Sequence, residues 1–423
     1  MLFSNTAAFA EQMDREDPLA PFRKKFLVPQ HNGVQSVYLL GNSLGLQPAS
    51  VKDYIGKILD DWAAHGVESF FDAKEPWMDY HDQLTGPLAT IVGAHKDEIA
   101  VMNQLSVNLH LMLVSFYRPD KKRFRIICEA KAFPSDQYVF ETHVRSLGLD
   151  PAQTIVEVTP AEGEDIIRTS DILDTIKKYG DETALVLFSG INYYTGQVFD
   201  MAAISKAAKA AGCRVGFDLA HAAGNIELKL HEWEVDFACW CNYKYLNSGP
   251  GAIGAVFIHR HNHDDSLQRF AGWWGYDKPT RFRMEKGFRP MAGAEGWQLS
   301  TPALLLYATC RASLEIFEEA GWENIQAKRK KLTAYTWFLL DELARDNGRD
   351  TMRFITPAAP EAHGSQVSVL MARRGRETYE ALMKQQVMVD WREPNVIRFA
   401  PVPLYNSYSD VYRLVSALRN LTQ

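Results

Sequence analysis

The sequence has no apolar run near the length of about 18 residues that a membrane-spanning helix needs. Its N-terminal segment is charged and lacks the apolar core of a secretion signal, so we expect neither membrane insertion nor export. Cysteine is scarce, with five residues in a chain of 423, and the five are scattered along the sequence. This pattern favours a reducing, cytoplasmic compartment.

An excess of positive charge is also missing. The net charge is −6 and no basic stripe accompanies it, which argues against nucleic acid as a partner. The longest basic run, residues 328–331, lies in an amphipathic helical pattern and is interpreted as a solvated helix face. Residues 259–265 are rich in histidine and aspartate but lack the spacing of a metal site. They are interpreted as a solvated loop, and no metal is expected.

Two core strands are each predicted to end in a residue suited to cofactor chemistry. An apolar strand over residues 214–217 leads into Asp218, and a second one leads into Tyr243 and Lys244, 26 residues after Asp218 (244 − 218). A lysine amine can form a Schiff base with pyridoxal 5'-phosphate (PLP), and a carboxylate can hold the proton of its pyridinium ring. Ligands of α/β sheets bind outside the carboxyl ends of the strands, where both residues are expected. On spacing alone, a helix N-cap for Asp218 and a solvent-directed lysine remain alternatives.

The pattern along the chain predicts an α/β protein. A strand over 184–188, an Ala-rich helix over 201–211 that ends at Gly212, and the strand at 214–217 favour parallel pairing with a right-handed crossover. A strand over 124–128 and a helix over 135–147 precede them. We expect a large domain with a mostly parallel central sheet, residues 61–300.

After Pro302 the pattern changes. Helical periodicity continues to about residue 346 with a break near Gly321, and strand-like segments follow at 366–371 and 396–400. These features predict a smaller α+β domain, residues 301–423. The N-terminal segment, residues 1–60, is expected to pack with it.

Seven sequence words, in order, resemble the kynureninase family, which belongs to the aminotransferase class V-like superfamily of PLP enzymes with fold type I. The words are YLLGNSLGLQP (38–48), KAFPSD (131–136), LFSG (187–190), VGFDLAHAAGN (215–225), DFACWCNYKYLNSGPGA (236–252), RFAGWWGYD (269–277) and IRFAPVPLYNS (397–407). The resemblance covers nearly the whole chain. It implies hydrolysis of L-kynurenine, or 3-hydroxykynurenine, to anthranilate, or 3-hydroxyanthranilate, and L-alanine. This reaction belongs to tryptophan catabolism, the kynurenine pathway and NAD biosynthesis.

The resemblance also implies a set of site residues. Lys244 would carry PLP and move the α-proton, Asp218 would hold the ring nitrogen, and Tyr243 would act as general base and acid in hydration of the γ-carbonyl. The implied cofactor contacts are Leu105, Ser106, Phe133, Asp136, Ser189, Asp218, His221, Tyr243, Lys244, Trp273 and Thr301. In this family, residues matching Trp273 and Thr301 reach the phosphate of the neighbouring subunit, so a homodimer with shared active sites is expected.

For the substrate, Arg398 is the candidate partner of the α-carboxylate, because a guanidinium binds carboxylate in a bidentate fork. An arginine on the surface of an edge strand is the alternative. Asn42 and Ser43 are expected at the mouth of the site. Animal-type kynureninases carry histidine and asparagine where Phe70 and Thr301 align, so the aryl-binding wall of this chain is expected to differ from theirs.

Three other interpretations are weaker. A cysteine desulfurase on the same fold would need an exposed nucleophilic cysteine, whereas the five cysteines lie in apolar or helical patterns. A PLP-free scaffold protein would be expected to lose the lysine. The glycines at 249, 251 and 254 match G-x-G-x-x-G, but a strand rather than a helix is predicted to follow, which argues against dinucleotide binding.

Overall fold

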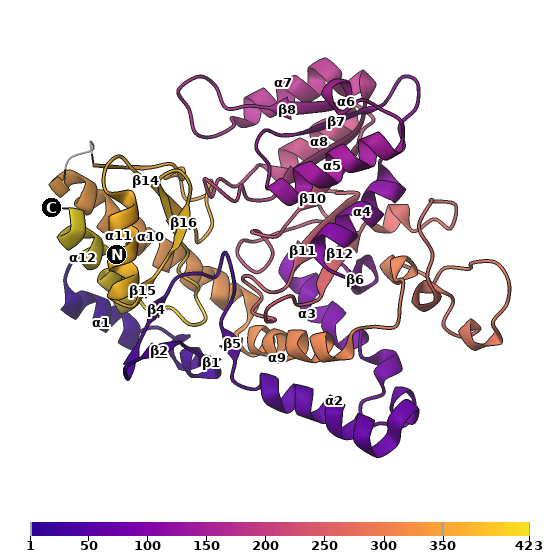
Figure 1. The fold of residues 1–423 in the computed structure, drawn as a ribbon, viewed down its shortest axis with the longest axis horizontal. Coiled ribbons are helices and arrows are strands. Elements are labelled where there is room, and N and C mark those ends of the chain that lie inside the picture. Colours follow the sequence, from indigo (N-terminus) through magenta and orange to yellow (C-terminus); the bar gives the residue numbers. More distant parts are fainter. Residues whose placement is uncertain (1, 348–350, 423) are drawn as a thin grey trace.

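A computed structural model describes residues 2–347 and 351–422, and Figure 1 shows their arrangement. A seven-stranded sheet has the spatial order β6-β12-β11-β10-β9-β7-β8. Its strands are β6 (Ile99–Val101), β7 (Arg125–Glu129), β8 (Ile155–Val158), β9 (Thr183–Ser189), β10 (Arg214–Asp218), β11 (Phe237–Cys241) and β12 (Gly254–Ile258). Neighbours from β8 to β11 are parallel, and β12 is antiparallel to β11 and β6. The predicted mostly parallel α/β sheet is confirmed.

Helices cover both faces of this sheet, because alternate strand residues point to opposite sides. In β9, Val186 and Phe188 pack in a core that includes α7 (Thr169–Tyr179) and α8 (Met201–Ala210). Leu185 and Leu187 instead pack in a second core with α4 (Leu105–Phe116) and α5 (Pro134–Ser146). Burial on both sides explains why β9 is an unbroken apolar run rather than an alternating one.

The strands that follow β7 in sequence are added to the sheet on opposite sides of β7. From β7 it passes through α5 and the short α6 (Pro151–Thr154) to β8 at the sheet edge, then returns to place β9 on the other side of β7. Such a switch point leaves a crevice at the carboxyl ends of the two strands, which is where ligands of open α/β sheets bind.

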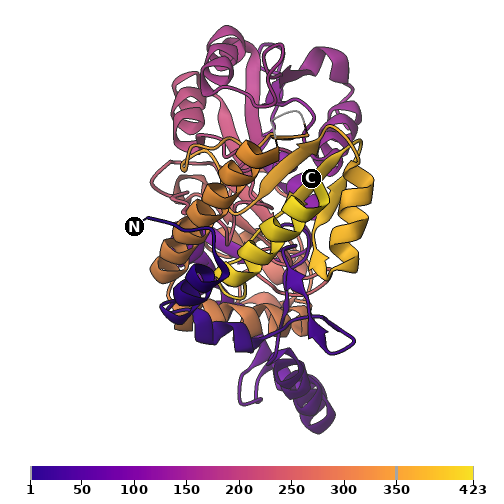
Figure 2. The ribbon, with the colours of Figure 1, turned by 90° about the vertical axis from the view of Figure 1, so that its left-hand side faces the viewer.

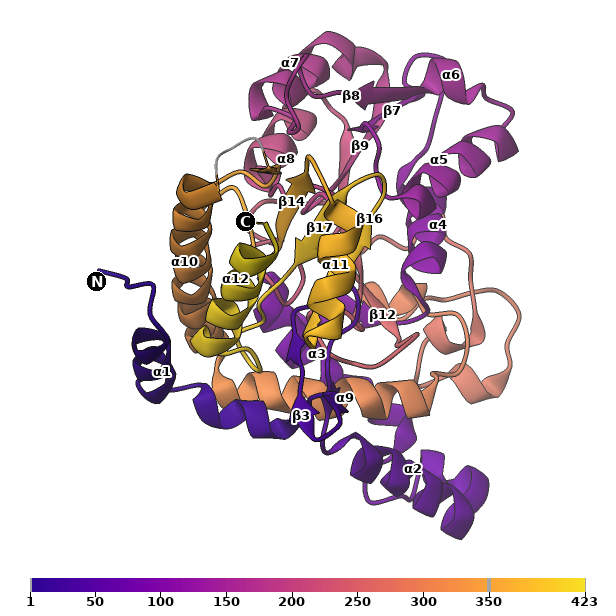
Figure 3. The same cartoon turned by 60° about the vertical axis from the view of Figure 1, so that its left-hand side comes forward.

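A four-stranded antiparallel sheet lies beside the first, in the order β13-β14-β17-β16. Its strands are β13 (Met352–Phe354), β14 (Val367–Met371), β16 (Asp390–Arg392) and β17 (Val396–Phe399). Three helices lie over it in Figure 2 and Figure 3: α10 (Trp322–Asn347), α11 (Gly375–Lys384) and α12 (Tyr408–Thr422).

The N-terminal segment contributes to the core of this second unit. Ala10 and Met13, from α1 (Ala7–Arg15), pack there with Val37 of β4 (Val37–Tyr38). β4 pairs in parallel with β15 (Val387–Met388). The remaining short strands are β1 (Phe26–Leu27), β2 (Gln30–His31), β3 (Val34–Gln35) and β5 (Gln47–Pro48).

The helical stretch that follows residue 302 is broken where the sequence indicated. α9 (Leu304–Ala320) ends at Gly321, whose φ of 78° lies in the left-handed region that glycine tolerates, and α10 begins at the next residue. α9 packs against α2 (Val51–His65) and α3 (Asp82–Val92), within the core of the seven-stranded sheet. The division of the chain into residues 1–60, 61–300 and 301–423 stays a prediction.

The basic run at 328–331 is not simply a solvated helix face, and that prediction is wrong for two of its residues. Lys328 and Arg329 are buried, and Lys328 Nζ lies 2.6 Å from a carboxylate oxygen of Asp17, whose side chain is 3% exposed. Lys330 does point outward, where it pairs with Glu227. Because charge alone does not show which face of a helix is covered, the partner in the N-terminal segment could not be seen in the sequence.

Across the described ranges, 2–347 and 351–422, the helices are all too short or too polar to cross a bilayer.

Candidate active site

A cavity of about 150 Å³ opens at the switch point, at the carboxyl ends of β7, β9 and β10. Nine of the residues that the sequence singled out line it together: Leu105, Ser106, Phe133, Asp136, Ser189, Asp218, His221, Tyr243 and Lys244. They come from parts of the chain that are distant in sequence and meet because parallel strands end at one edge of the sheet. These nine residues therefore bring an amine, two acids and three hydroxyls into one small space.

Lys244 does not lie at a strand end, contrary to the prediction. β11 ends at Cys241, and Lys244 follows in the turn beyond it. Its Nζ lies 5.9 Å from the ring centroids of both Phe133 and Tyr243. The amine thus faces two aromatic surfaces inside the cavity and forms no ion pair with another described residue.

Asp218 and Asp136 form a buried acidic pair. Asp218 ends β10, and its Oδ1 accepts a hydrogen bond of 2.7 Å from the Ala220 backbone N–H. Burial raises the pKa of Asp218, while the Ala220 N–H and the charge of Lys244 oppose that shift. Burial, and then the charge of Asp218, raise the pKa of Asp136 well above its usual range. Lys244 is thus the one cation that acts on the pair among the described residues, and a cationic ring nitrogen would supply a second positive charge.

Two helix N-termini converge on the cavity. α4 begins at Leu105 and α5 at Pro134, and the hydroxyl oxygens of Ser106 and Ser135 lie 2.6 Å apart. Backbone N–H groups at helix starts carry partial positive charge and bind phosphate. Ser106 was predicted at such a helix start. Ser135 was missed, although it stands in the quoted word KAFPSD.

His221 carries a buried nitrogen that has no partner. Its side chain is 7% exposed, and Nδ1 makes no hydrogen bond within the described structure. Burial, and then the charge of Lys244, lower the pKa of His221 well below its usual range, so the ring is neutral. A buried, unsatisfied nitrogen is costly unless a bound group completes the site. This nitrogen, the acidic pair, the amine and the paired helix starts together fit PLP.

Glu129 is a further lining residue that sequence reasoning missed. It ends β7, is buried, and both of its carboxyl oxygens lie close to Ser189 Oγ, at 2.8 and 2.9 Å. Burial raises the pKa of Glu129 to about 8, and the charge of Asp218 adds to that shift. The available signal was an acid at the end of an apolar strand, the same signal that singled out Asp218.

Six predicted residues lie outside this lining: Trp273, Thr301 and Phe70, and also Arg398, Asn42 and Ser43. Trp273 is 42% exposed and Thr301 is exposed, both on the segment between β12 and α9. Phe70 packs edge-on against Trp77, with ring centroids 5.2 Å apart. Within one chain, therefore, Trp273 and Thr301 are not brought to the cavity.

Arg398 is buried at 1% exposure within the four-stranded sheet, so the alternative of an edge-strand surface arginine is wrong. Its Nε donates to Asp390 at 3.0 Å, and its Nη1 donates to the carbonyl oxygen of Tyr193, a lining residue. The same carbonyl accepts from Gln366, whose side chain also accepts from Asn42 Nδ2 at 3.1 Å. Ser43 lies beside Asn42 in sequence, and its buried hydroxyl has no hydrogen-bond partner among the described residues. Arg398 and Asn42 thus border the cavity through Tyr193 and Gln366.

The histidine-rich stretch differs from the predicted solvated loop. His259 and Asn262 are buried, and the ring of His259 stacks on His231 with centroids 4.7 Å apart. His231 lies near His95 and Glu98, a grouping of ligand types that could approach a metal. The Glu98 carboxylate already has hydrogen-bond partners in place of a metal ion. It accepts hydrogen bonds from the backbone N–H groups of His95 and Arg260 and contacts His231 Nδ1. As predicted, a strand, β12, follows the glycine pattern at 249–254.

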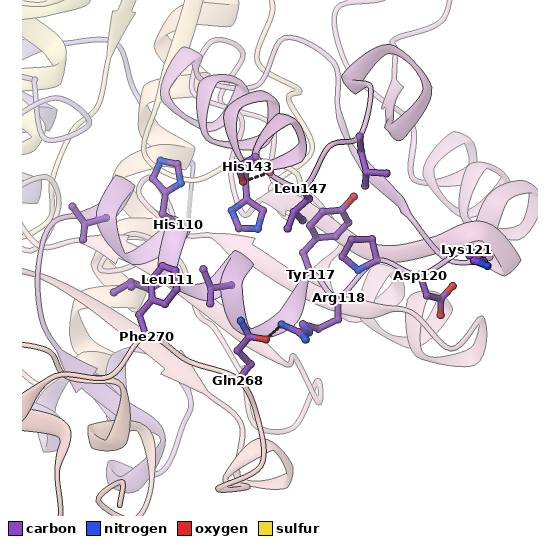
Figure 4. A pocket seen from close by; sticks show the side chains of 15 residues that line it. His110, Leu111, Tyr117, Arg118, Asp120, Lys121, His143, Leu147, Gln268 and Phe270 are labelled. Carbon is purple, nitrogen blue, oxygen red and sulfur yellow. Dashed lines mark hydrogen bonds between the residues drawn. The ribbon is translucent and has the colours of Figure 1, made fainter. Parts of the chain in front are cut away.

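A larger groove of about 940 Å³ lies on the outer side of α4 and α5 (Figure 4). His110, Leu111, His143, Leu147 and Phe270 are among its lining side chains. None of the predicted site residues lines it, and the acid and the lysine in its own lining are Asp120 and Lys121.

Comparison with known proteins agrees with this geometry. A family model described as "Kynureninase C-terminal domain" matches residues 325–418. The chain is 51% identical over 420 residues to a kynureninase of Flavobacterium psychrophilum, and the match covers 99% of both proteins. It is also 51% identical over 417 residues to a kynureninase of Koribacter versatilis, where the match covers 98% of this chain and 97% of that protein.

Among solved structures, a C-DES mutant with glycine covalently linked to its PLP cofactor superposes with a TM-score of 0.76 at 18% identity, covering 91% of this chain and 96% of that one. The apo cysteine desulfurase of Thermococcus onnurineus NA1 gives a TM-score of 0.75 at 19% identity, covering 97% and 98%. At such identities the likeness establishes the fold alone, which is the fold type I expected from the sequence.

Proposed function

This chain belongs to the kynureninase family, and we propose that the cavity at the carboxyl ends of β7, β9 and β10 is its active site. It is a PLP-dependent hydrolase that cleaves the Cβ–Cγ bond of L-kynurenine, a carbon–carbon bond next to a ketone, to give anthranilate and L-alanine. The observation that carries the site assignment is the meeting of Lys244, Asp218 and two helix starts in one cavity.

Different residues of the cavity suit different parts of the cofactor. The helix starts at Leu105 and Pro134, with the hydroxyls of Ser106 and Ser135, suit the phosphate. Phe133 would offer an aromatic face to the ring, and Asp218 would hold a proton at the ring nitrogen. PLP, when bound, draws electrons away from the substrate Cα.

Two residues move protons in this proposal. Lys244 would hold the cofactor through its amine, and the same amine would take the proton from the substrate Cα. Tyr243 acts at the γ-carbonyl of the substrate, where water adds. Burial raises the pKa of Tyr243, so its hydroxyl keeps its proton and can donate it to the carbonyl oxygen.

The substrate side is formed by Arg398, Asn42 and Ser43. Arg398 already pairs with Asp390, which leaves Nη1, now donating to Tyr193, as the nitrogen nearest to the cavity lining. We propose that the α-carboxylate of the substrate binds at this nitrogen. Arg398→Lys should then raise KM far more than it lowers kcat, because an ammonium cannot serve Asp390 and a second carboxylate in one plane.

A homodimer completes the site in this proposal. Trp273 and Thr301 lie outside the cavity of their own chain, and their segment turns apolar side chains outward, among them Phe270 and Met284. A second copy would cover that apolar surface and bring Trp273 to the partner's phosphate. PLP affinity should fall on dilution, together with the dimer fraction in sedimentation. A monomer with full activity would contradict this.

A cysteine desulfurase is the second enzyme on this fold, but no observation favours it. All five cysteines are buried, and burial raises the pKa of each thiol. A nucleophilic thiolate needs the opposite environment. The five free thiols do support the proposal of a reducing, cytoplasmic location.

Covalent labelling tests the assignment. Borohydride reduction of the holoenzyme, followed by peptide mapping, should place the pyridoxyl group on Lys244. Lys244→Ala should remain folded and lose turnover, whereas Lys206→Ala, on an exposed position of α8, should behave as wild type. A label on any other lysine would contradict the assignment.

A further inference from the structure

Glu129 and Ser189 end the two strands that flank the switch point, β7 and β9. Glu129 is 1% exposed, and its two carboxyl oxygens lie 2.8 and 2.9 Å from Ser189 Oγ. No Lys, Arg or His forms an ion pair with it in residues 2–347 and 351–422. Glu129 is therefore a buried acid whose one side-chain partner is a hydroxyl that itself lines the cavity.

The groups around Glu129 do not supply a compensating charge. The charges that act on it and its neighbours belong to Asp218 on β10 and Asp136 on α5, and Cys128 precedes it on β7. The positive charge of Lys244 acts on Asp136 and Asp218. Of the three buried carboxyl groups, two are thus stabilised by the one amine and Glu129 is not. Because buried charges without partners are strongly disfavoured, the group as a whole retains protons.

Asp218 is the acid that must be ionised if it holds the ring nitrogen, and it has both the Ala220 N–H and Lys244 to support its charge. Glu129 has neither. Burial raises the pKa of Glu129 to about 8, so near neutral pH its carboxyl group carries a proton.

A proton on Glu129 decides the direction of the hydrogen bond to Ser189. A hydroxyl group has one hydrogen to donate and two lone pairs to accept with. If Glu129 is ionised, the Ser189 hydrogen is taken up by the carboxylate and only lone pairs face the cavity. If Glu129 is protonated, it donates to Ser189 Oγ, and the hydrogen of Ser189 is free to point into the cavity.

We propose that Glu129 is a positioning residue that donates its proton to Ser189 Oγ and so makes Ser189 a hydrogen-bond donor toward the bound PLP. This deepens the proposed function and rests on it. The role belongs to the cofactor-loaded protein and is exerted through the hydroxyl of Ser189, to which Glu129 is hydrogen-bonded.

Three variants separate this role from simple packing. Glu129→Gln keeps a neutral donor for Ser189 but cannot lose a proton. Glu129→Ala removes the donor. Glu157→Gln is the matched control, because Glu157 lies on the adjacent strand β8, opposite Cys128, and is exposed to solvent.

The measurements are the PLP affinity by equilibrium dialysis and the absorbance spectrum of the bound cofactor between about pH 7 and pH 9. Wild type and Glu157→Gln should share a spectral transition near pH 8, because Ser189 turns when Glu129 loses its proton. Glu129→Gln should bind PLP within about threefold of wild type and lack that transition. Glu129→Ala should bind about tenfold more weakly.

Two results would overturn the proposal. One is a Glu129→Gln protein that keeps the wild-type transition, which would assign the proton to another group. The other is Glu129→Gln binding PLP as weakly as Glu129→Ala, which would show that the ionised form is required. In the Ser189→Ala background, Glu129→Gln and Glu129→Ala should bind equally. Borohydride labelling of Lys244 in each variant tests the proposed function separately. A failure of the proposed function can therefore be distinguished from a failure of the role proposed for Glu129.

Discussion

The hydroxyl oxygens of Ser106 and Ser135 lie 2.6 Å apart and join the first turns of α4 and α5. Two helix dipoles therefore present their positive ends to one point of the cavity rim. An anion bound there would receive N–H groups from both helices at once.

Removal of these hydroxyls should weaken phosphate binding. Ser106→Ala and Ser135→Ala should each raise the Kd of PLP by roughly 10- to 100-fold, because hydrogen bonds to charged groups contribute about 1.5–3 kcal/mol. Equilibrium dialysis would measure this. Ser146→Ala, at the far end of α5, is the control and should leave the Kd unchanged. A Kd unaffected in both variants would move the phosphate elsewhere.

Asp218→Asn should separate charge from backbone capping. The Asn side chain can still accept the N–H of Ala220, so the local turn is kept. It cannot hold a proton on the ring nitrogen, and kcat should fall by roughly 100-fold or more. Asp218→Glu should lose less if charge matters more than reach.

Asp200→Asn provides a matched comparison, because Asp200 caps α8 through a hydrogen bond of 2.9 Å to the backbone N–H of Ala203. It should keep wild-type kcat. Wild-type turnover in Asp218→Asn would show that Asp218 is a capping residue and that another group serves the ring nitrogen.

The buried pair of Lys328 and Asp17 should matter for stability. Their side chains are 5% and 3% exposed, so removal of one partner leaves an uncompensated buried charge. Asp17→Asn or Lys328→Met should each lower the free energy of unfolding by about 3–5 kcal/mol, measured in urea. The double variant should recover part of that loss.

Lys330 and Glu227 form the matched exposed pair, also 2.6 Å apart but with side chains 58% and 56% exposed. Lys330→Ala should change the free energy of unfolding by about 0–1 kcal/mol, because solvent screens the pair. Equal losses at the two pairs would show that burial does not control this interaction.

Substrate choice can be tested at Phe70 and Thr301. Phe70 offers only an apolar ring, and a buried substrate hydroxyl without a partner costs about 1–3 kcal/mol. We therefore expect kcat/KM for L-kynurenine to be at least as high as for 3-hydroxykynurenine. Phe70→His combined with Thr301→Asn should shift the ratio toward the hydroxylated substrate. A wild-type protein with a strong preference for 3-hydroxykynurenine would contradict this expectation.

The parts of the site that lie in short sequence words were predictable. Asp218 and His221 stand in one word, and Tyr243 and Lys244 in another, so each word carried its own strand, turn and polar side chain. Alternation of strand and helix also predicted β7, β9 and β10 and their parallel pairing. Local pattern was sufficient in these cases because a parallel sheet brings all such strand ends to one edge.

Pairings between distant segments were not predictable in the same way. Glu129 and Ser189 are 60 residues apart, and Lys328 and Asp17 are further apart still. Arg398 looked like an edge residue because nothing in its strand shows that β16 covers it on one side and β14 on the other. In each case the missing information was the neighbour across the sheet or across the interface between helices, which local periodicity does not encode.

All five native cysteines are buried, so their thiols should react slowly with labelling reagents: Cys128, Cys213, Cys239, Cys241 and Cys310. A cysteine introduced at an exposed position would be the thiol that reacts first with a maleimide dye. One such dye on α7 and another on α11 would report the distance between the two sheets by energy transfer. Movement of the two halves on substrate binding could then be followed in solution without removing any native cysteine.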